Sequence, residues 1–174
     1  MALRRDSLEG VQPVQVEVHH PDEIGTLFDG AIVYAKGARL LRMLQHYIGH
    51  EAFQNGLKTY FAKHAYGNTI GSDLWHALGE ASGKDIAGFM ASWITQSGYP
   101  VVEATQNGSQ LTLKQQQFFV GPHQPSSKLW PIPLGANDAA VPELLDTTEL
   151  TLTRTSSELL RLNTEDTAHF ITQY

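Results

Sequence analysis

The chain contains no cysteine among its 174 residues. This absence excludes disulfide bonds, thiolate metal sites and a cysteine nucleophile. It suits a reducing compartment, and we expect a cytoplasmic location. No apolar run approaches the roughly 18 residues of a membrane-spanning helix. The N-terminus MALRRDSLEG also lacks the apolar core of a secretory signal peptide, so neither a membrane segment nor a signal peptide is expected.

Basic residues are also few. Twelve Lys and Arg stand against 18 Asp and Glu, which gives a net charge of −6 at pH 7. A nucleic-acid-binding domain needs a basic face, and only Arg4 and Arg5 stand together, so we expect no nucleic-acid partner. The glycine motifs that bind phosphate groups are absent. A hydrophobic content of 41% is ordinary for a folded chain of one large or two small domains.

The pattern of apolar residues changes near Gly98. Before this residue apolar side chains recur at helical spacing, and after it they alternate or form short runs rich in Thr, Leu and Val. The sequence therefore predicts an α+β fold. Residues 1–98 are expected to form an α-helical lobe, and residues 99–174 a small antiparallel β-sandwich.

Residues 1–20 are predicted to form an extended arm ahead of the helices. Val14, Val16 and Val18 alternate with polar residues, as in a half-buried strand. Pro21 then opens a short helix, because proline is favoured at the first helical position.

Four longer helices follow in the prediction, most of them ended by glycine. Asp29 and Asp85 are plausible N-caps of the first and the last of these helices. The apolar positions of the first are Val33, Gly37, Leu40, Leu41, Leu44 and Ile48. Aromatic residues at helical spacing in the others are interpreted as core, namely Phe53, Trp75, Phe89 and Trp93.

The second part of the chain shows strand patterns. VVEATQNGSQLTLKQ is predicted to be a hairpin about Asn107 and Gly108, the strongest short hairpin signal. Residues 129–134 are predicted to form a strand that Pro131 and Pro133 confine to an edge or to a bulge. Further short strands are predicted at Leu150 and Leu152, at Leu160 and Leu162, and over residues 169–174.

His46 and His50 are candidate metal ligands, because they are four residues apart in a predicted helix. The zinc-peptidase motif H-E-x-x-H needs a glutamate after the first histidine, and Tyr47 stands there. Arg39 and Arg42 continue the same polar face, and their charge opposes metal binding. We interpret this face as solvated, with a metal-binding module as an alternative.

Other polar groups have ordinary structural explanations. His19 and His20 are adjacent, so in an extended chain they point to opposite sides. Asp22 and Glu23 lie in a first helical turn, where acids favour the helix dipole. None of four serines lies in a nucleophile-elbow context: Ser7, Ser72, Ser82 and Ser97.

Tyr34 is the candidate catalytic residue. It shares a row with Gly30, Gly37 and Ala38, where side chains are small. A phenol with a pKa near 10 donates a hydrogen bond at pH 7. Such a donor to a tetrahedral oxyanion is worth roughly 10²–10³ in rate. The spacing alone favours a structural tyrosine and leaves the catalytic role open.

Several short motifs follow one another along the chain. They are Tyr34-Ala35-Lys36-Gly37, Gly56-Leu57 with Tyr60, Tyr66-Gly67-Asn68, Asp73-Leu74-Trp75, and the segment Trp93 to Val102. In this order they resemble the aminopeptidase N family of zinc metallopeptidases, the gluzincin aminopeptidases. The arm from Arg5-Asp6-Ser7 to His20-Pro21 resembles the family's linking segment. LTLKQQQF and Trp130 to Leu134 resemble its β-sandwich domain.

The resemblance implies both a fold and a reaction. The fold is the helical part of a thermolysin-like catalytic domain followed by a β-sandwich. The reaction is the removal of N-terminal residues from peptide substrates by a zinc-activated water. In this family the tyrosine at the position of Tyr34 donates a hydrogen bond to the tetrahedral oxyanion. The family's H-E-x-x-H zinc motif and G-x-M-E-N signature are absent from this sequence.

We therefore expect a fragment of a zinc aminopeptidase that is inactive by itself. The zinc and the remaining domains would belong to other parts of the same polypeptide, and no zinc is expected in this chain. Helices that normally pack on those parts would expose apolar faces, so self-association is expected. The alternative is a non-catalytic binding or interaction module that retained only the scaffold.

Overall fold

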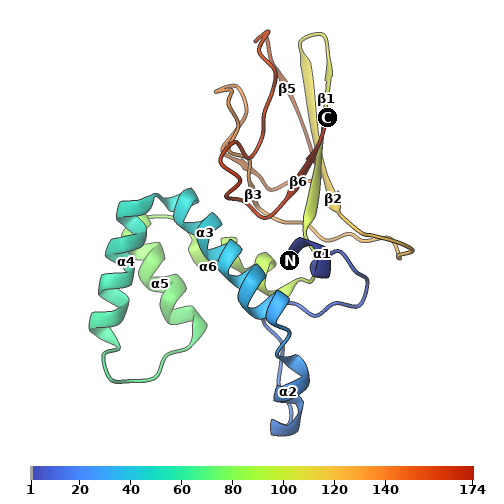
Figure 1. Cartoon of the computed structure of the whole chain (residues 1–174). Coiled ribbons are helices and arrows are strands. Elements are labelled where there is room, and N and C mark those ends of the chain that lie inside the picture. Colours follow the sequence, from blue (N-terminus) through green and yellow to red (C-terminus); the bar gives the residue numbers. More distant parts are fainter. Residues whose placement is uncertain (1) are drawn as a thin grey trace.

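The computed structural model describes residues 2–174 and has an α+β fold, shown in Figure 1. The helices within this range are α1 (Ala2–Asp6), the 3₁₀ helix η1 (Pro21–Glu23), α2 (Ile24–Leu27), the π-helix η2 (Ala31–Lys36), α3 (Gly37–Ile48), α4 (His50–Lys63), α5 (Gly71–Ser82) and α6 (Ile86–Thr95). The strands are β1 (Pro100–Asn107), β2 (Gln110–Gln117), β3 (Ile132–Pro133), β4 (Leu144–Leu145), β5 (Glu149–Thr153) and β6 (Ile171–Gln173). None of the helices in the described range is long and apolar enough to span a membrane.

The prediction of an extended N-terminal arm is wrong for its first residues. Ala2–Asp6 form the short helix α1, which packs against η2. Residues 11–20 contain no strand, although their valines alternate with polar residues. The reason is that the segment lies beside a helix end rather than a strand, and the Gln15 N–H donates to Ile94 O at 2.8 Å.

The helix starts predicted from Pro21, Asp29 and Asp85 are confirmed. Pro21 opens η1. The Asp29 carboxylate accepts a hydrogen bond from the Ala31 N–H at 2.9 Å, ahead of η2. The Asp85 carboxylate likewise accepts from the Gly88 N–H at 2.9 Å and caps α6. Each cap satisfies a backbone donor that has no partner within its own helix.

The predicted apolar face of the helix after Asp29 is only partly correct. Leu40 is buried in α3, but Leu41 is 39% exposed. In η2 the buried residues are Ile32 and Lys36, not the predicted Val33. The π-helix explains the shift, because its i→i+5 hydrogen bonds place an extra residue in the turn and rotate the preceding positions.

The main sheet has the strand order β5-β2-β1-β6. β1 and β2 form the predicted hairpin, in which Asn107 pairs with Gln110 across the turn. The prediction of an antiparallel sheet is wrong for β6. This strand runs parallel to β1, with Val101 opposite Ile171. β6 occupies the edge of β1 that the hairpin leaves open, and it reaches that edge in the parallel direction through the long connection after β5.

The remaining strand predictions have mixed outcomes. Ile132–Pro133 form β3, which pairs only with β4 in a two-stranded sheet, as the prolines predicted. The strand predicted at Leu160 and Leu162 does not form. Its backbone bonds to a loop instead, because Asn137 N–H donates to Arg161 O at 3.0 Å.

One hydrophobic core extends through the helices and the strands. Trp93 of α6 and Trp130 before β3 are fully buried, with ring centroids 6.2 Å apart. The Trp93 Nε1–H donates to Pro131 O at 3.0 Å. Phe89 is also buried, as predicted, and Trp75 and Phe53 pack against the core from its edge. Figure 1 shows α3 and α6 beside the sheet and α4 and α5 farther from it.

The two-domain division at residue 98 stays a prediction.

Candidate functional site

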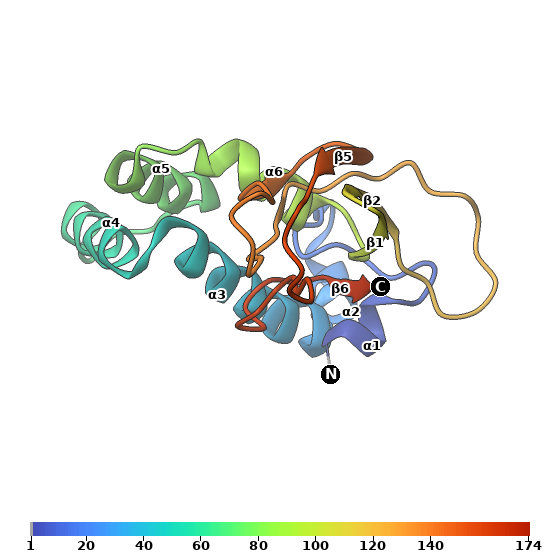
Figure 2. The ribbon, with the colours of Figure 1, turned by 90° about the horizontal axis from the view of Figure 1, so that it is seen from above.

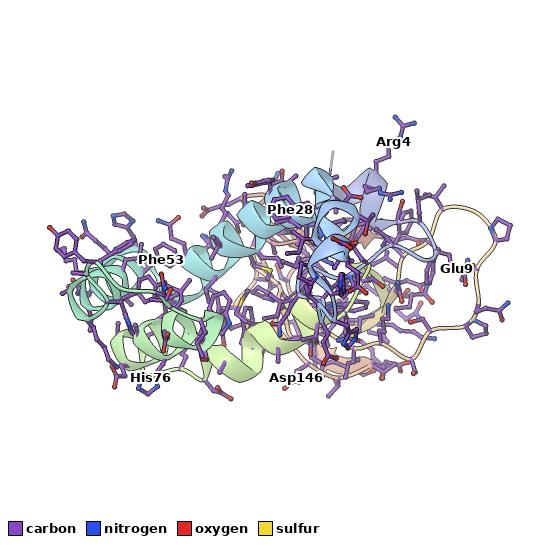
Figure 3. All side chains as sticks on the ribbon, turned by 90° about the horizontal axis from the view of Figure 1, so that it is seen from below. Arg4, Glu9, Phe28, Phe53, His76 and Asp146 are labelled. Carbon is purple, nitrogen blue, oxygen red and sulfur yellow. The ribbon has the colours of Figure 1, made fainter. Side chains whose placement is uncertain are left out.

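Tyr34 lies in the π-helix η2, just before that helix continues into α3. Its side chain is 65% exposed, and the Phe28 ring meets it edge-on at 5.8 Å between centroids. In Figure 3, Phe28 lies among the blue helical segments of the N-terminal part of the chain. Single π-helical turns are rare and occur frequently at functional sites. The sequence therefore directs the phenol of Tyr34 to the surface at an unusual turn.

Tyr34 lies at an apolar pocket of about 380 Å³. The walls come from the arm, η2, α3, α5 and α6, and include Val14, Val33, Leu41, Leu74, Trp75 and Ile94. Gly37 and Ala38 also line the pocket, so two of the three small residues predicted to share a row with Tyr34 lie beside it there.

Lys36 anchors η2 on the side opposite the phenol. Its side chain is fully buried, and its ammonium lies 2.9 Å from Asp6 Oδ2. The same ammonium donates to Gly98 O at 2.9 Å and to Gln96 O at 3.3 Å. The three donors of the ammonium are therefore all satisfied, as a buried cation requires.

Asp6 joins Lys36 to the end of the chain. Asp6 Oδ1 accepts from the Gly98 N–H at 2.9 Å, and Asp6 Oδ2 accepts from His169 Nε2 at 3.2 Å. We refer to the side chains of Asp6, Lys36 and His169 as the buried ionic cluster. The cluster joins α1, η2 and the segment just before β6. Gly98, between α6 and β1, bonds to both Asp6 and Lys36. Figure 2 shows α1 beneath β6.

Burial and charge set the protonation of the cluster. Burial by itself raises the pKa of Asp6, but the hydrogen bond from His169 and the charge of Lys36 lower it below its ordinary value. Burial lowers the pKa of Lys36 against the attraction of Asp6. Burial also lowers the pKa of His169, so the imidazole is neutral at pH 7. Burial and the charge of Asp6 raise the pKa of the neighbouring Tyr99 to about 12.

The structure places the two candidate metal ligands on different helices, although both line a shallow pocket that also contains Arg42. His46 lies in α3, but Gly49 ends that helix with φ 85°, and His50 begins α4. His46 Nδ1 is 3.6 Å from Glu165 Oε2, and His50 Nδ1 is 3.1 Å from Gln45 Nε2. The two histidines therefore do not share one helical face, and each has its own polar neighbour.

The described residues do not fit a zinc ion. Residues 2–174 contain no group of three His, Cys, Asp or Glu side chains placed to hold a metal. The sequence His50-Glu51-Ala52-Phe53-Gln54 approaches the H-E-x-x-H pattern, but Gln54 stands where the second histidine is needed. A catalytic zinc needs three protein ligands, so this segment does not supply a site.

The other polar candidates make local contacts. The Asp22 N–H donates to His20 Nδ1 at 3.3 Å, and the His19 N–H donates to Glu23 Oε2 at 3.1 Å. These bonds close the turn at the start of η1. The Ser7 hydroxyl donates to Arg4 O at 3.0 Å. These contacts are structural, as the sequence suggested.

The buried ionic cluster was not predicted as part of the site. Asp6 and Lys36 stand within two of the motifs that carry the family resemblance, and this was the available signal. A lysine such as Lys36 is usually interpreted as a surface charge. No nearby sequence pattern identifies Asp6 as its partner. His169 has no such signal, because only the fold brings it to Asp6.

Comparison with known proteins identifies the family. Residues 1–93 match the peptidase family M1 domain, which is more than half of the chain. The chain belongs to peptidase family M1. The match contains Tyr34, Lys36 and Asp6 of this M1 chain, while His169 lies beyond it.

Three relatives illustrate the similarity. Aminopeptidase N of Lactococcus lactis subsp. lactis is 52% identical over 99% of this M1 chain, and aminopeptidase N of Lactobacillus delbrueckii subsp. lactis is 46% identical over 99%. Tricorn protease-interacting factor F2 of Thermoplasma acidophilum is 47% identical over 76% of the chain. The aligned regions make up 21%, 21% and 17% of these relatives. The M1 chain thus spans about a fifth of the length of the curated relatives it matches.

Proposed function

We propose that this chain is part of a zinc-dependent aminopeptidase that hydrolyses N-terminal residues from peptides. Within it, Tyr34 donates a hydrogen bond to the oxyanion of the tetrahedral intermediate, and the chain is inactive by itself. The family match and the identity to aminopeptidase N relatives support the reaction class. The observation that carries the role of Tyr34 is its exposed phenol at an apolar pocket, on a turn anchored from behind by Lys36.

The reaction requires a hydrogen-bond donor that acts when the carbonyl oxygen becomes negatively charged. Attack of water on a peptide carbonyl converts the carbonyl oxygen into an oxyanion, and a donor placed there stabilises the transition state more than the substrate. A neutral phenol meets this need at pH 7, because it keeps its proton and shares it in a hydrogen bond. Its proton stays on Tyr34 throughout.

The remaining machinery would come from outside this chain. The described residues do not fit a zinc ion, and neither H-E-x-x-H nor G-x-M-E-N occurs in the sequence. The metal, the base that activates water and the group that binds the substrate's amine would therefore be held by other residues of the enzyme. Tyr34 contributes only to the oxyanion.

The proposal is tested by measuring aminopeptidase activity of the chain alone and of the chain joined to a zinc-bearing segment. We expect the isolated chain to release no chromophore from an aminoacyl anilide. The same chain, joined to an M1 segment with H-E-x-x-H, should release it in a reaction that a chelator stops. Chelator-sensitive turnover by the isolated chain would contradict the proposal, as would a joined polypeptide that binds zinc, is folded and remains inactive.

The coding sequence upstream of Met1 provides an independent test. A reading frame that continues upstream through H-E-x-x-H supports the aminopeptidase. A start codon with its own ribosome-binding site, and no such motif upstream, would instead support a non-catalytic binding module built on the M1 scaffold.

A further inference from the structure

We infer that Lys36 is a positioning residue for Tyr34, and that its ion pair with Asp6, closed by His169, sets the direction of the phenol. The inference rests on the catalytic role proposed for Tyr34. It gives Lys36, Asp6 and His169, which lie outside the pocket, a role in the reaction. None of the three contacts the substrate in this role.

The first argument is the geometry of η2. Tyr34 and Lys36 are two positions apart, and two helical positions place side chains on nearly opposite sides of the axis. Their burial agrees, because Tyr34 is 65% exposed and Lys36 is fully buried. Any rotation of η2 about its axis therefore moves the phenol and the ammonium together.

The second argument is that the acceptors of Lys36 lie on other segments. Asp6 belongs to α1, and the carbonyls of Gln96 and Gly98 belong to the connection between α6 and β1. A rotation of η2 would break all three contacts inside the protein, where an unpaired ammonium is strongly unfavourable. The ion pair thus fixes the turn against both a helix and the sheet.

The third argument is that few side chains of η2 itself are buried, although Asp29 just before it pairs with Arg5 of α1 at 2.7 Å. Only Ile32 and Lys36 are buried among its six residues. The preceding segment offers weak support, since Ile24 and Phe28 are 51% and 57% exposed. π-Helical turns are also rare, and most occur as single turns within an α-helix. Lys36 is therefore the polar half of a two-residue anchor.

His169 extends this anchor to the C-terminal strand. Its Nε2–H donates to the same Asp6 oxygen that pairs with Lys36. Its Nδ1 is buried and has no hydrogen-bond partner within residues 2–174, which agrees with a neutral ring. Arg39 of α3 holds the approach to His169 by donating to Ala168 O at 2.9 Å. The connection into β6 thereby contributes to the direction of Tyr34.

Exchange of backbone hydrogens in the chain itself tests the anchor. In Lys36→Met, the amides of Ala31–Gly37 should exchange about tenfold faster or more, because local opening no longer breaks a buried pair. Lys84→Met is the matched control, because Lys84 Nζ also bridges segments, to Tyr47 O and Glu143. It should leave those amides unchanged. Equal exchange of these amides in Lys36→Met and the wild type would overturn the inference.

A second variant guards against loss of folding. Lys36→Met in an Asp6→Asn background leaves no unpaired buried charge, and it should fold while still showing faster exchange over Ala31–Gly37. His169→Gln keeps the ion pair and a donor toward Asp6, so it should stay within about twofold of the wild type. Exchange over Ala31–Gly37 in the double variant that is no faster than in the wild type would overturn the inference.

A kinetic cycle in the joined, zinc-bearing polypeptide separates positioning from general support of the fold. Lys36→Met should lower kcat about tenfold or more and change KM by less than about twofold. In a Tyr34→Phe background it should lower kcat by less than about twofold, because the phenolic hydroxyl it positions is already gone.

The outcomes distinguish the two proposals. A Lys36→Met effect of equal size in both backgrounds would show that Lys36 does not act through Tyr34, and would overturn the inference alone. An unchanged kcat in Tyr34→Phe by itself would instead overturn the catalytic role of Tyr34, on which the inference rests.

Discussion

Asp6 and Lys36 form an ion pair of 2.9 Å in which neither side chain is exposed to solvent. The pair joins the short N-terminal helix α1 to the π-helix that carries Tyr34. A buried ion pair adds little net stability, but removal of one partner leaves a buried charge without compensation. The pair therefore makes the integrity of η2 depend on residues that lie far from it in the sequence.

The first prediction concerns the stability that depends on this pair. Lys36→Met should lower the free energy of unfolding by about 3–5 kcal/mol, because Asp6 is left buried and unpaired. Urea unfolding followed by circular dichroism measures the change. Lys84→Met is the control, since its partner Glu143 is exposed, and it should change the free energy by less than about 1 kcal/mol. Equal effects of the two substitutions would show that Lys36 is not the buried anchor.

The second prediction concerns pH. The ordinary pKa of histidine is 6.5, and burial lowers the pKa of His169 in the folded chain. The unfolded chain therefore binds a proton at this residue at a higher pH than the folded chain does. Its contribution to stability is fully present above pH 6.5, and it is lost as the pH falls from 6.5 toward the lowered pKa. Asp6 adds a further loss that begins below pH 3.8, since its pKa is also lowered.

Urea unfolding at several pH values measures this loss. The charged groups around the ring are Asp6, Lys36 and Arg39. In His169→Gln the fall in unfolding free energy between pH 6.5 and 4.5 should be smaller than in the wild type. An identical fall in both proteins would assign it to other groups.

The third prediction concerns Gly98, whose N–H and C=O both bind the buried ionic cluster. Its φ is +86°, and an added Cβ would displace the Gln117 side-chain amide, which accepts a hydrogen bond from Ser126. Gly98→Ala should therefore cost about 2–3 kcal/mol of unfolding free energy. Gly108→Ala is the control, because Gly108 also has a positive φ but open space at its Cβ, and it should cost only about 1 kcal/mol. Equal losses would mean that backbone strain alone explains both.

The fourth prediction concerns metal content. We expect the purified chain to hold far less than one zinc per chain, because a zinc site needs at least three ligands in one place. Elemental analysis after dialysis measures this. Substitution of His46 and His50 by alanine should leave the zinc content unchanged. About one zinc per wild-type chain, lost in the double variant, would establish the metal-binding module instead.

Local features of the fold could be predicted because local residues determine them. The turn about Gly108 and the cap at Asp85 depend on neighbours within a few positions, and both formed as predicted. The N-terminal arm and the direction of β6 depend on which distant segment each one meets. Alternation in the arm indicated a half-buried face, but it carried no information on whether a strand or a helix covers that face.

The candidate site shows the same division. Tyr34 was proposed from the family resemblance, and the structure places its phenol at the surface beside small residues. The π-helix was missed because the spacing was read with the α-helical period. The burial of Lys36 was missed because a lysine is rarely inside a protein without a partner, and its partners lie elsewhere in the chain. Long-range pairing of charges has no local pattern.

The most direct test of the account is the kcat of Tyr34→Phe in the joined, zinc-bearing polypeptide. Loss of the hydroxyl removes the oxyanion donor and leaves the ring against Phe28, so the turn should stay folded. The account predicts that kcat falls by roughly 10²–10³ while zinc content and KM change little. An unchanged kcat would contradict it and would reduce Tyr34 to a structural residue.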